Sequence, residues 1–364
     1  MKLQFTEEQA MFADTVSRLL EGRYDFEHRR ALLKAGPSMD AGLWAALAEL
    51  GAFHLLVSEE QGGLGGAMAD CGLLAMYLGG RLVAEPVVAL GMVPARLFGA
   101  LGVEDRLEAQ LEGVVRTLVL DARAQLPGNP EGADLNFRLA EGTAAATDIA
   151  VLAADGSLWG IVADAPGVTV APSRMLDGRL SGDVRISGAS GFQRLADDAA
   201  AAFDRVRAEA AVVEQWFQLG SMKSALAATV AYMKERRQFG RTLGAFQSVQ
   251  LRVAEMAVAC EEARAATLLA AVRFDAATSD DARASACASG KLQVARTARV
   301  VAEGAVQLHG GIGVSEELPI SAHYRQMLAF CARYGTPDDA ALTIARTTID
   351  TGSYAHSAVL GEPA

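Results

Sequence analysis

The feature that most constrains the fold is a hydrophobic periodicity that changes twice along the chain. Residues 1 to about 115 carry apolar side chains at helical spacing, residues 116–195 carry short β-branched and apolar runs, and residues 200–350 return to helical spacing. This order predicts a mainly α protein with a small antiparallel β-domain in its middle. We therefore expect an N-terminal helical domain over 1–115, a shortened middle β-domain over 116–195, a C-terminal four-helix bundle over 200–350 and a tail over 351–364.

The N-terminal region has clear helix signals. Thr6 followed by Gln9 matches a capping box, in which the threonine accepts from the third helical amide and the glutamine reaches back. A further helix is expected over 43–50, ended by Gly51. After a glycine-rich loop over 58–66, another apolar helix should run to about Gly80.

The middle region carries a strong hairpin signal. Asp155-Gly156 joins the apolar runs 148–154 and 157–163, and both residues tolerate the positive φ of a tight turn. The short runs around it are the basis for the expected antiparallel β-domain.

The C-terminal region predicts long packed helices. One apolar stripe steps by four, three and four residues, through Val249, Val253, Met256 and Cys260. A second long helix is expected from about Ala282 to Leu308, ended by Gly310-Gly311.

The composition excludes several classes of function. A formal net charge of −11 argues against nucleic-acid binding, which needs clustered lysine and arginine. The four cysteines show no paired spacing, so neither a disulfide framework nor a metal site is expected. The first residues carry acids where a signal peptide needs an apolar core, and no apolar stretch is long enough to span a membrane. We expect a soluble cytoplasmic protein.

The segment 232–250, YMKERRQFGRTLGAFQSVQ, is a candidate anion site. An arginine near a helix end can donate two parallel hydrogen bonds to a diphosphate, and the start of the next helix attracts negative charge. Taken alone, the same residues fit a charged helix end followed by a turn at least as well.

The segment 305–319, AVQLHGGIGVSEELP, is the second candidate. Paired glycines let a backbone pass close to a flat or phosphorylated ligand. They follow an expected helix rather than a strand, so they are not a dinucleotide-binding Rossmann fingerprint, and by themselves they also fit a helix cap.

Taken together, the two segments resemble the signatures of the acyl-CoA dehydrogenase family. Glu235 through Gln247 follow the pattern ERxxFGxxLxxFQ, and Gln307 through Arg325 follow QxxGGxG…ExP…R. The resemblance implies FAD held at a subunit interface in an oligomer, where this chain's residues reach a flavin bound mainly by its neighbour. It assigns Arg236 to the diphosphate of FAD. The residues that it assigns to the adenosine side and the adenine end are Gln238, Phe239, Leu243, Gln247, Gln307, Gly310 and Gly311.

The chain departs from that family at the catalytic base. The position of the family's glutamate near the C-terminus falls on Tyr334, and a neutral phenol is a poor base for a weakly acidic C–H. A second family location for the base falls on Ala210, next to Glu209, whose side chain would point elsewhere because a helix turns about 100° per residue. Glu214, one turn farther along, fits a solvated or paired acid.

The middle region departs as well. The family's loop and strand that hold the flavin ring and thioester are replaced by LVLDARAQLPGNPEGAD and by a deletion around Gly142. The leading hypothesis is therefore a small, non-catalytic subunit of a heteromeric acyl-CoA dehydrogenase, similar to the small subunits of pimeloyl-CoA dehydrogenases and to paired dehydrogenases of steroid side chains. It implies a shared FAD, a glutamate-bearing partner subunit, an acyl-CoA substrate and an electron-transferring flavoprotein as acceptor.

Two alternatives stay open at this point. One is a homomeric, competent dehydrogenase that uses Glu209 or Tyr334 as its base. The other is a flavin-free interaction protein that retains only the fold.

Overall fold

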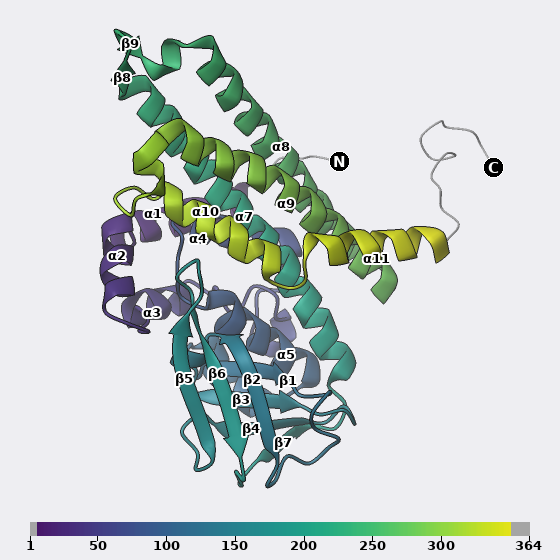
Figure 1. Ribbon diagram of the computed structural model, residues 1–364. Coiled ribbons are helices and arrows are strands. Elements are labelled where there is room, and N and C mark those ends of the chain that lie inside the picture. The colour runs from purple at the N-terminus through teal and green to yellow at the C-terminus, as the bar shows by residue number, and fades with distance from the viewer. Residues whose placement is uncertain (1–5, 351–364) are drawn as a thin grey trace, which may run out of the picture.

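The computed structural model describes residues 6–350, so the expected tail over 351–364 lies outside the described residues. Helices, then strands, then helices follow one another along the chain, as the periodicity predicts (Figure 1). Thr6 and Gln9 form the expected capping box at the start of the first helix. The N-terminal helices are α1 (Glu7–Arg23), α2 (Phe26–Lys34), α3 (Ala41–Glu49), α4 (Met68–Gly80), the π-helix η2 (Val87–Met92), α5 (Val93–Leu101) and α6 (Glu104–Leu111).

Helix α4 crosses the long helix α7 (Ala200–Glu235) at very short range, and glycines make this possible. A Cβ on Gly79 would lie 1.9 Å from the carbonyl oxygen of Phe217, and one on Gly220 would lie 1.8 Å from that of Met76. Because no side chain fits at either position, the N-terminal helices are locked directly onto the bundle.

The strands of the middle region form two sheets in the lower part of the molecule in the view of Figure 1. One sheet has the order β1-β3-β4-β7 and the other has the order β2-β6-β5. The hairpin expected at Asp155-Gly156 joins β3 to β4 in antiparallel register. The strands are β1 (Thr117–Asp121), β2 (Asp134–Glu141), β3 (Asp148–Leu152), β4 (Leu158–Val162), β5 (Val168–Arg174), β6 (Leu180–Ser187) and β7 (Gln193–Ala196).

The expectation of a wholly antiparallel β-domain was wrong for one pair. Strands β1 and β3 run parallel, with Thr117 opposite Asp148 and Asp121 opposite Leu152. The chain leaves β1, forms β2 in the other sheet, and returns in the original direction, so the crossover imposes a parallel pairing. The pair also leaves β1 at the edge of its sheet.

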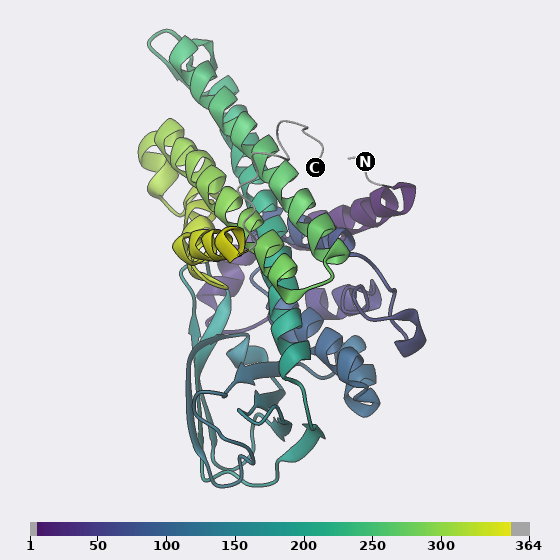
Figure 2. The ribbon, with the colours of Figure 1, turned by 90° about the vertical axis from the view of Figure 1, so that its right-hand side faces the viewer.

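The remaining helices pack around α7, and no described helix is long and apolar enough to cross a membrane. At 36 residues, α7 is roughly 54 Å long, so its two ends lie in different parts of the molecule (Figures 1 and 2). A small hairpin of β8 (Arg237–Gln238) and β9 (Arg241–Thr242) follows its far end. The other elements are α8 (Gln247–Ala276), α9 (Asp280–His309), α10 (Ile320–Ala332) and α11 (Pro337–Asp350).

Candidate functional site

The first motif forms the far end of the bundle. Arg236 is the C-cap residue of α7, and the β8–β9 hairpin turns at Phe239 and Gly240, both with positive φ. Phe239 is 89% exposed, and its ring meets that of Phe246 edge-on at 6.1 Å. A non-glycine residue held in a left-handed conformation with its aromatic ring in solvent is costly, so this tip is built for contact rather than for its own core.

The second motif lies against the first. The ring of His309, the last residue of α9, stacks on Tyr232 at 4.5 Å, and Tyr232 stands one turn before Arg236. The Nδ1–H of His309 donates to the Ala305 carbonyl at 2.8 Å, and burial lowers the pKa of His309, which keeps the ring neutral at pH 7. The fold therefore brings both sequence motifs to one end of the bundle.

Several residues at this end of the bundle carry exposed groups that could bind a ligand. The guanidinium of Arg236 is exposed and has no ion pair or hydrogen bond within the described range 6–350. A Cβ placed on Gly310 or Gly311 would meet nothing within 4 Å, so both backbones face open space. Gln238, Gln247 and Gln307 are likewise exposed. A free cation, exposed amides and an exposed ring are the groups that hold a diphosphate and an adenine, so the residues present fit that end of FAD.

Tyr334 lies in a different place, in a cleft between the β-region and the bundle. The cleft has a volume of about 540 Å³ and is lined by β1, by the end of β2 and by residues 329–335. Tyr334 adopts a left-handed conformation with φ of 54°. Burial raises the pKa of Tyr334 above its ordinary value, and Glu141 and Glu214 raise it further, so the phenol is neutral and cannot serve as an activated base.

Lys291 of α9 stabilises the turn that carries Tyr334 through hydrogen bonds to backbone carbonyls. The ammonium donates to the Arg333 carbonyl at 2.8 Å and to the Phe330 carbonyl, and it lies 3.9 Å from the Phe330 ring centroid. Burial lowers the pKa of Lys291 to about 8. These bonds satisfy carbonyls that the end of α10 leaves without a helical partner.

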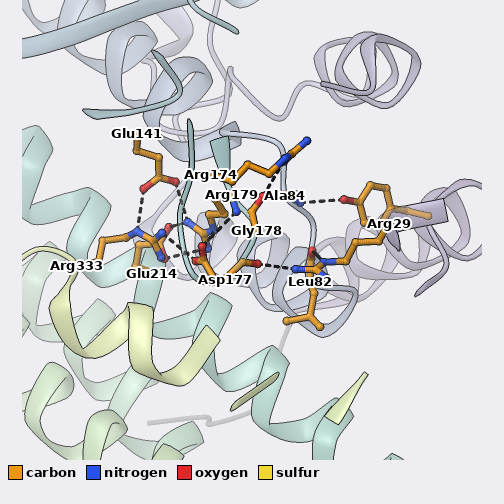
Figure 3. Close-up of polar contacts among 11 residues, drawn as sticks. Arg29, Leu82, Ala84, Glu141, Arg174, Asp177, Gly178, Arg179, Glu214 and Arg333 are labelled. Carbon is orange, nitrogen blue, oxygen red and sulfur yellow. Dashed lines mark hydrogen bonds and ion pairs between the residues drawn. The ribbon is translucent and has the colours of Figure 1, made fainter. Parts of the chain in front are cut away.

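Beside Tyr334 lies a buried cluster of alternating charges, which we call the ion-pair cluster (Figure 3). Arg179 contacts Glu214 at 2.6 Å and Glu141 at 3.0 Å, while Arg333 contacts Glu141 at 2.8 Å and Asp177 at 3.0 Å. Each of its three carboxylates therefore faces at least one guanidinium, and Glu214 is a structural ion-pair partner rather than a candidate base.

The cluster continues into the N-terminal helices. The guanidinium of Arg29 on α2 donates to the Asp177 carbonyl at 2.5 Å and to the Leu82 carbonyl at 2.8 Å (Figure 3). Burial alone would raise the pKa of Asp177, but Arg333 and Arg179 outweigh it and hold that pKa below its ordinary value. The sequence analysis missed this cluster, because its members come from distant segments and no local spacing marks them.

Glu209, the weaker candidate base, is also neutralised. Its carboxylate contacts Arg96 at 3.2 Å and Arg205 at 3.1 Å, and its side chain is almost fully buried. The cavity beside Glu209 and Ala210, between η2, α5 and α7, measures about 10 Å³. That volume holds one water molecule at most, so no substrate carbon can reach this carboxylate in the described conformation.

The two regions are far apart within one chain. Arg207 of α7 lines the cleft, and Arg236 follows it by 29 residues along the same helix. At 1.5 Å per residue, roughly 44 Å of helix separates the cleft from the bundle end.

Comparison with known proteins agrees with this architecture. The model for "Acyl-CoA dehydrogenase, C-terminal domain" matches residues 194–349, and that for "Acyl-CoA dehydrogenase, N-terminal domain" matches residues 6–100. Acyl-CoA dehydrogenase IpdE2 of Mycolicibacterium smegmatis is 30% identical over 91% of this chain and 96% of its own length.

Solved structures are similar over nearly the whole length. The ChsE4–ChsE5 complex from Mycobacterium tuberculosis matches with a TM-score of 0.85 at 21% identity, covering 96% of this chain and 99% of the matched one. A variant of the Tcur3481–Tcur3483 steroid ACAD matches with a TM-score of 0.83 at 22% identity, covering 95% and 99%.

Proposed function

The chain belongs to the acyl-CoA dehydrogenase family, whose members use FAD, and from that premise we propose that it is the non-catalytic subunit of a heteromeric acyl-CoA dehydrogenase. In the complex, a partner subunit supplies the glutamate base, and this chain supplies contacts to the partner's FAD. The complex introduces an α,β double bond into an acyl-CoA thioester.

The observation that carries the proposal is the state of the carboxylates around the cleft. The acids that line it are Asp121 and Glu141, and both are ion-paired with arginines. Abstraction of an α-proton needs a carboxylate that is free to accept it. Together with the neutral phenol of Tyr334 and the enclosed Glu209, this leaves the described cleft without a suitable base.

The proposal that this chain contacts the partner's FAD rests on the distance along α7 between the cleft and the bundle end. Since Arg236 stands roughly 44 Å of helix away from this chain's own cleft, it suits a cofactor that enters from another subunit. Arg236 would neutralise the diphosphate, Gln238 and Phe239 would contact the adenosine side with Leu243 and Gln247 nearby, and Gln307 with Gly310 and Gly311 would close over the adenine end. The flavin of the bound cofactor accepts the β-hydride in this family.

The outer face of α8 carries exposed apolar residues, which favours an interface with a protein partner there. Leu251, Val258, Leu269 and Val272 are exposed large apolar residues, and their spacing places them on one side of the helix. An apolar stripe of this kind on a soluble protein marks an interface. The ChsE4–ChsE5 and Tcur3481–Tcur3483 relatives carry two chain names each, which is consistent with a heteromer here, and the steroid name of the latter favours a bulky acyl group as the substrate.

Comparison of the chain alone with the chain co-expressed beside a glutamate-bearing homologue tests the proposal. Native mass spectrometry should give an assembly that contains both chains, and visible absorbance should give stoichiometric flavin in the complex but little in the chain alone. Stoichiometric flavin and turnover in the chain alone would establish a homomeric enzyme instead. A mixed assembly without flavin or turnover would establish an interaction protein.

A further inference from the structure

A second cavity lies where α1, α2, α4, α7 and α10 meet, on the side of the bundle that carries the N-terminal helices (Figure 1). Its volume is about 420 Å³, within the range of small-molecule sites. It shares no lining residue with the cleft around Tyr334. Nothing in the proposed dehydrogenase function uses it.

The charged side chains that line this cavity are positive, whereas the chain as a whole is negative. The protein has a net charge of −11, yet among the described residues no aspartate or glutamate lines the cavity, and two cations do, Arg81 and Lys223. Lys223 is exposed and has no ion pair or hydrogen bond with any residue in the described part of the chain. Arg81 contacts Glu21 at 3.4 Å, but both side chains are well exposed, so this ion pair is weak and exchanges readily.

A buried histidine supplies a neutral polar group to the same cavity. His323 of α10 is 4% exposed and lines the cavity, and its Nδ1 lies 2.8 Å from the Ser221 hydroxyl oxygen. Burial lowers the pKa of His323 to about 3, with a further contribution from Arg29, so the ring carries one proton at pH 7. When Ser221 donates to Nδ1, that proton sits on Nε2, which has no partner within residues 6–350 and can donate to a ligand.

The remaining walls are partly apolar. Phe26, Met76 and Leu82 line the cavity, and Ser224 adds a hydroxyl beside Lys223 on α7. Pro319 places the start of α10 at the cavity, where the helix dipole favours negative charge.

We propose that this cavity binds an amphipathic anion, with a carboxylate or phosphate head group at Lys223, Arg81 and His323 and a short apolar chain against Phe26, Met76 and Leu82. Two cations, of which only the exposed Arg81 has an acidic partner, and a neutral N–H donor select an oxyanion, and the apolar walls select a chain attached to it. The inference is independent of the subunit role, because none of its residues lies in the cleft or at the bundle end.

Calorimetric titration of the full-length protein with octanoate, octyl phosphate and octylamine tests this site. Octanoate or octyl phosphate should bind with one-to-one stoichiometry, and the preferred one identifies the head group, whereas octylamine should not bind. Failure of both anions to bind, or equal binding of the amine, would overturn the proposal.

Matched variants assign the binding to this cavity. Lys223→Gln should weaken binding of the anion about tenfold or more, since it removes a charge-assisted hydrogen bond, and Arg81→Gln should weaken it by less because Glu21 already shares that cation. Lys34→Gln removes an exposed lysine elsewhere, and Arg207→Gln removes a cation of the cleft, so both should leave the affinity unchanged. Unchanged affinity in Lys223→Gln, or a loss in Arg207→Gln, would place the ligand elsewhere and refute the site.

Discussion

The bundle end and the cleft around Tyr334 both carry charged and polar residues, but they use them in opposite ways. At the bundle end, the guanidinium of Arg236 has no ion pair or hydrogen bond among the described residues, and Phe239 is exposed apart from its edge-on contact with Phe246. The glycines after α9 face open space. Beside the cleft, Arg179 and Arg333 are ion-paired with three carboxylates and are nearly inaccessible, although Arg179 Nε and Arg333 Nη1 have no hydrogen-bond partner among the described residues. Polar groups without internal partners suit a ligand that arrives from outside, whereas ion-paired groups stabilise the chain that carries them.

This contrast separates two roles that a single active site normally combines. A family member that holds both a base and a cofactor must keep some polar groups under-satisfied in its cleft, at a cost in stability. Here ion pairs beside the cleft join α7, the β5–β6 turn and the turn after α10, whereas the bundle end keeps exposed polar groups available. The difference predicts that mutations in the two regions will alter different quantities.

The largest effect is expected at the centre of the ion-pair cluster. Arg179→Met should destabilise the protein by about 3–5 kcal/mol, because it leaves Glu214 buried without its closest partner and removes one of the two arginines that contact Glu141. Denaturant unfolding measures the change. Arg138→Met, which removes an arginine of β2 whose side chain is 80% exposed, is the matched control and should change stability by less than about 0.5 kcal/mol. Equal effects of the two substitutions would show that the cluster contributes nothing special.

At the bundle end the expected effect is on cofactor binding. Arg236→Ala should weaken FAD retention in the complex by about 1.5–3 kcal/mol while both subunits stay folded, because the arginine makes no internal contact that folding would lose. Flavin-release titration measures it, and Arg264→Ala on α8, which removes an arginine paired with Glu261, serves as the control. Unchanged FAD affinity in Arg236→Ala would leave that residue as an ordinary surface arginine at a helix end.

What the sequence could predict about these two regions follows from how local their signals are. The capping box at Thr6 and Gln9 and the hairpin at Asp155-Gly156 are written in adjacent residues, and both are confirmed. The bundle-end residues were chosen from two short motifs, and the stacking of Tyr232 on His309 brings those motifs together as expected. Their cofactor roles stay predictions.

The ion-pair cluster and the parallel β1–β3 pair were not predictable in this way. Glu141, Asp177, Glu214 and Arg333 meet only after the β2-β6-β5 sheet and the helices α7 and α10 are in place, and each looks like an ordinary surface charge in its own segment. The β1–β3 pairing depends on β2 leaving for the other sheet, which no period-two pattern records. Long-range pairing of this kind leaves no trace in local spacing.

A smaller effect is expected on the acid side of the stability profile. Because the pKa of Asp177 is held below its unfolded value, its contribution is fully present above about pH 4 and is lost as the pH falls through the folded-state pKa. Asp177→Asn should therefore be less stable at pH 7 and should flatten the loss of stability below pH 4, by on the order of 1 kcal/mol. Urea unfolding at pH 7 and pH 3 measures both values. An acid limb as steep as that of the unmodified protein would mean that other carboxylates govern it.

The smallest effect is expected at Tyr334. A large effect there would most directly contradict the contrast between an inactive cleft and a ligand-binding bundle end. Tyr334→Phe removes only a neutral hydroxyl, because burial and the neighbouring Glu141 and Glu214 raise the pKa of the phenol. Turnover of the assembled complex should stay nearly unchanged, and Glu209→Gln should leave it equally unaffected, since that carboxylate faces Arg96 and a cavity with room for one water. A general base contributes about 10²–10⁴-fold to the rate, so a catalytic role at either position could not hide within the error of a steady-state assay. A hundredfold loss of turnover in Tyr334→Phe, with flavin content and assembly intact, would mean that the cleft is active and that its ion pairs open during the reaction. Tyr334→Glu should not by itself create activity, because the position of a base relative to the substrate matters before its pKa does.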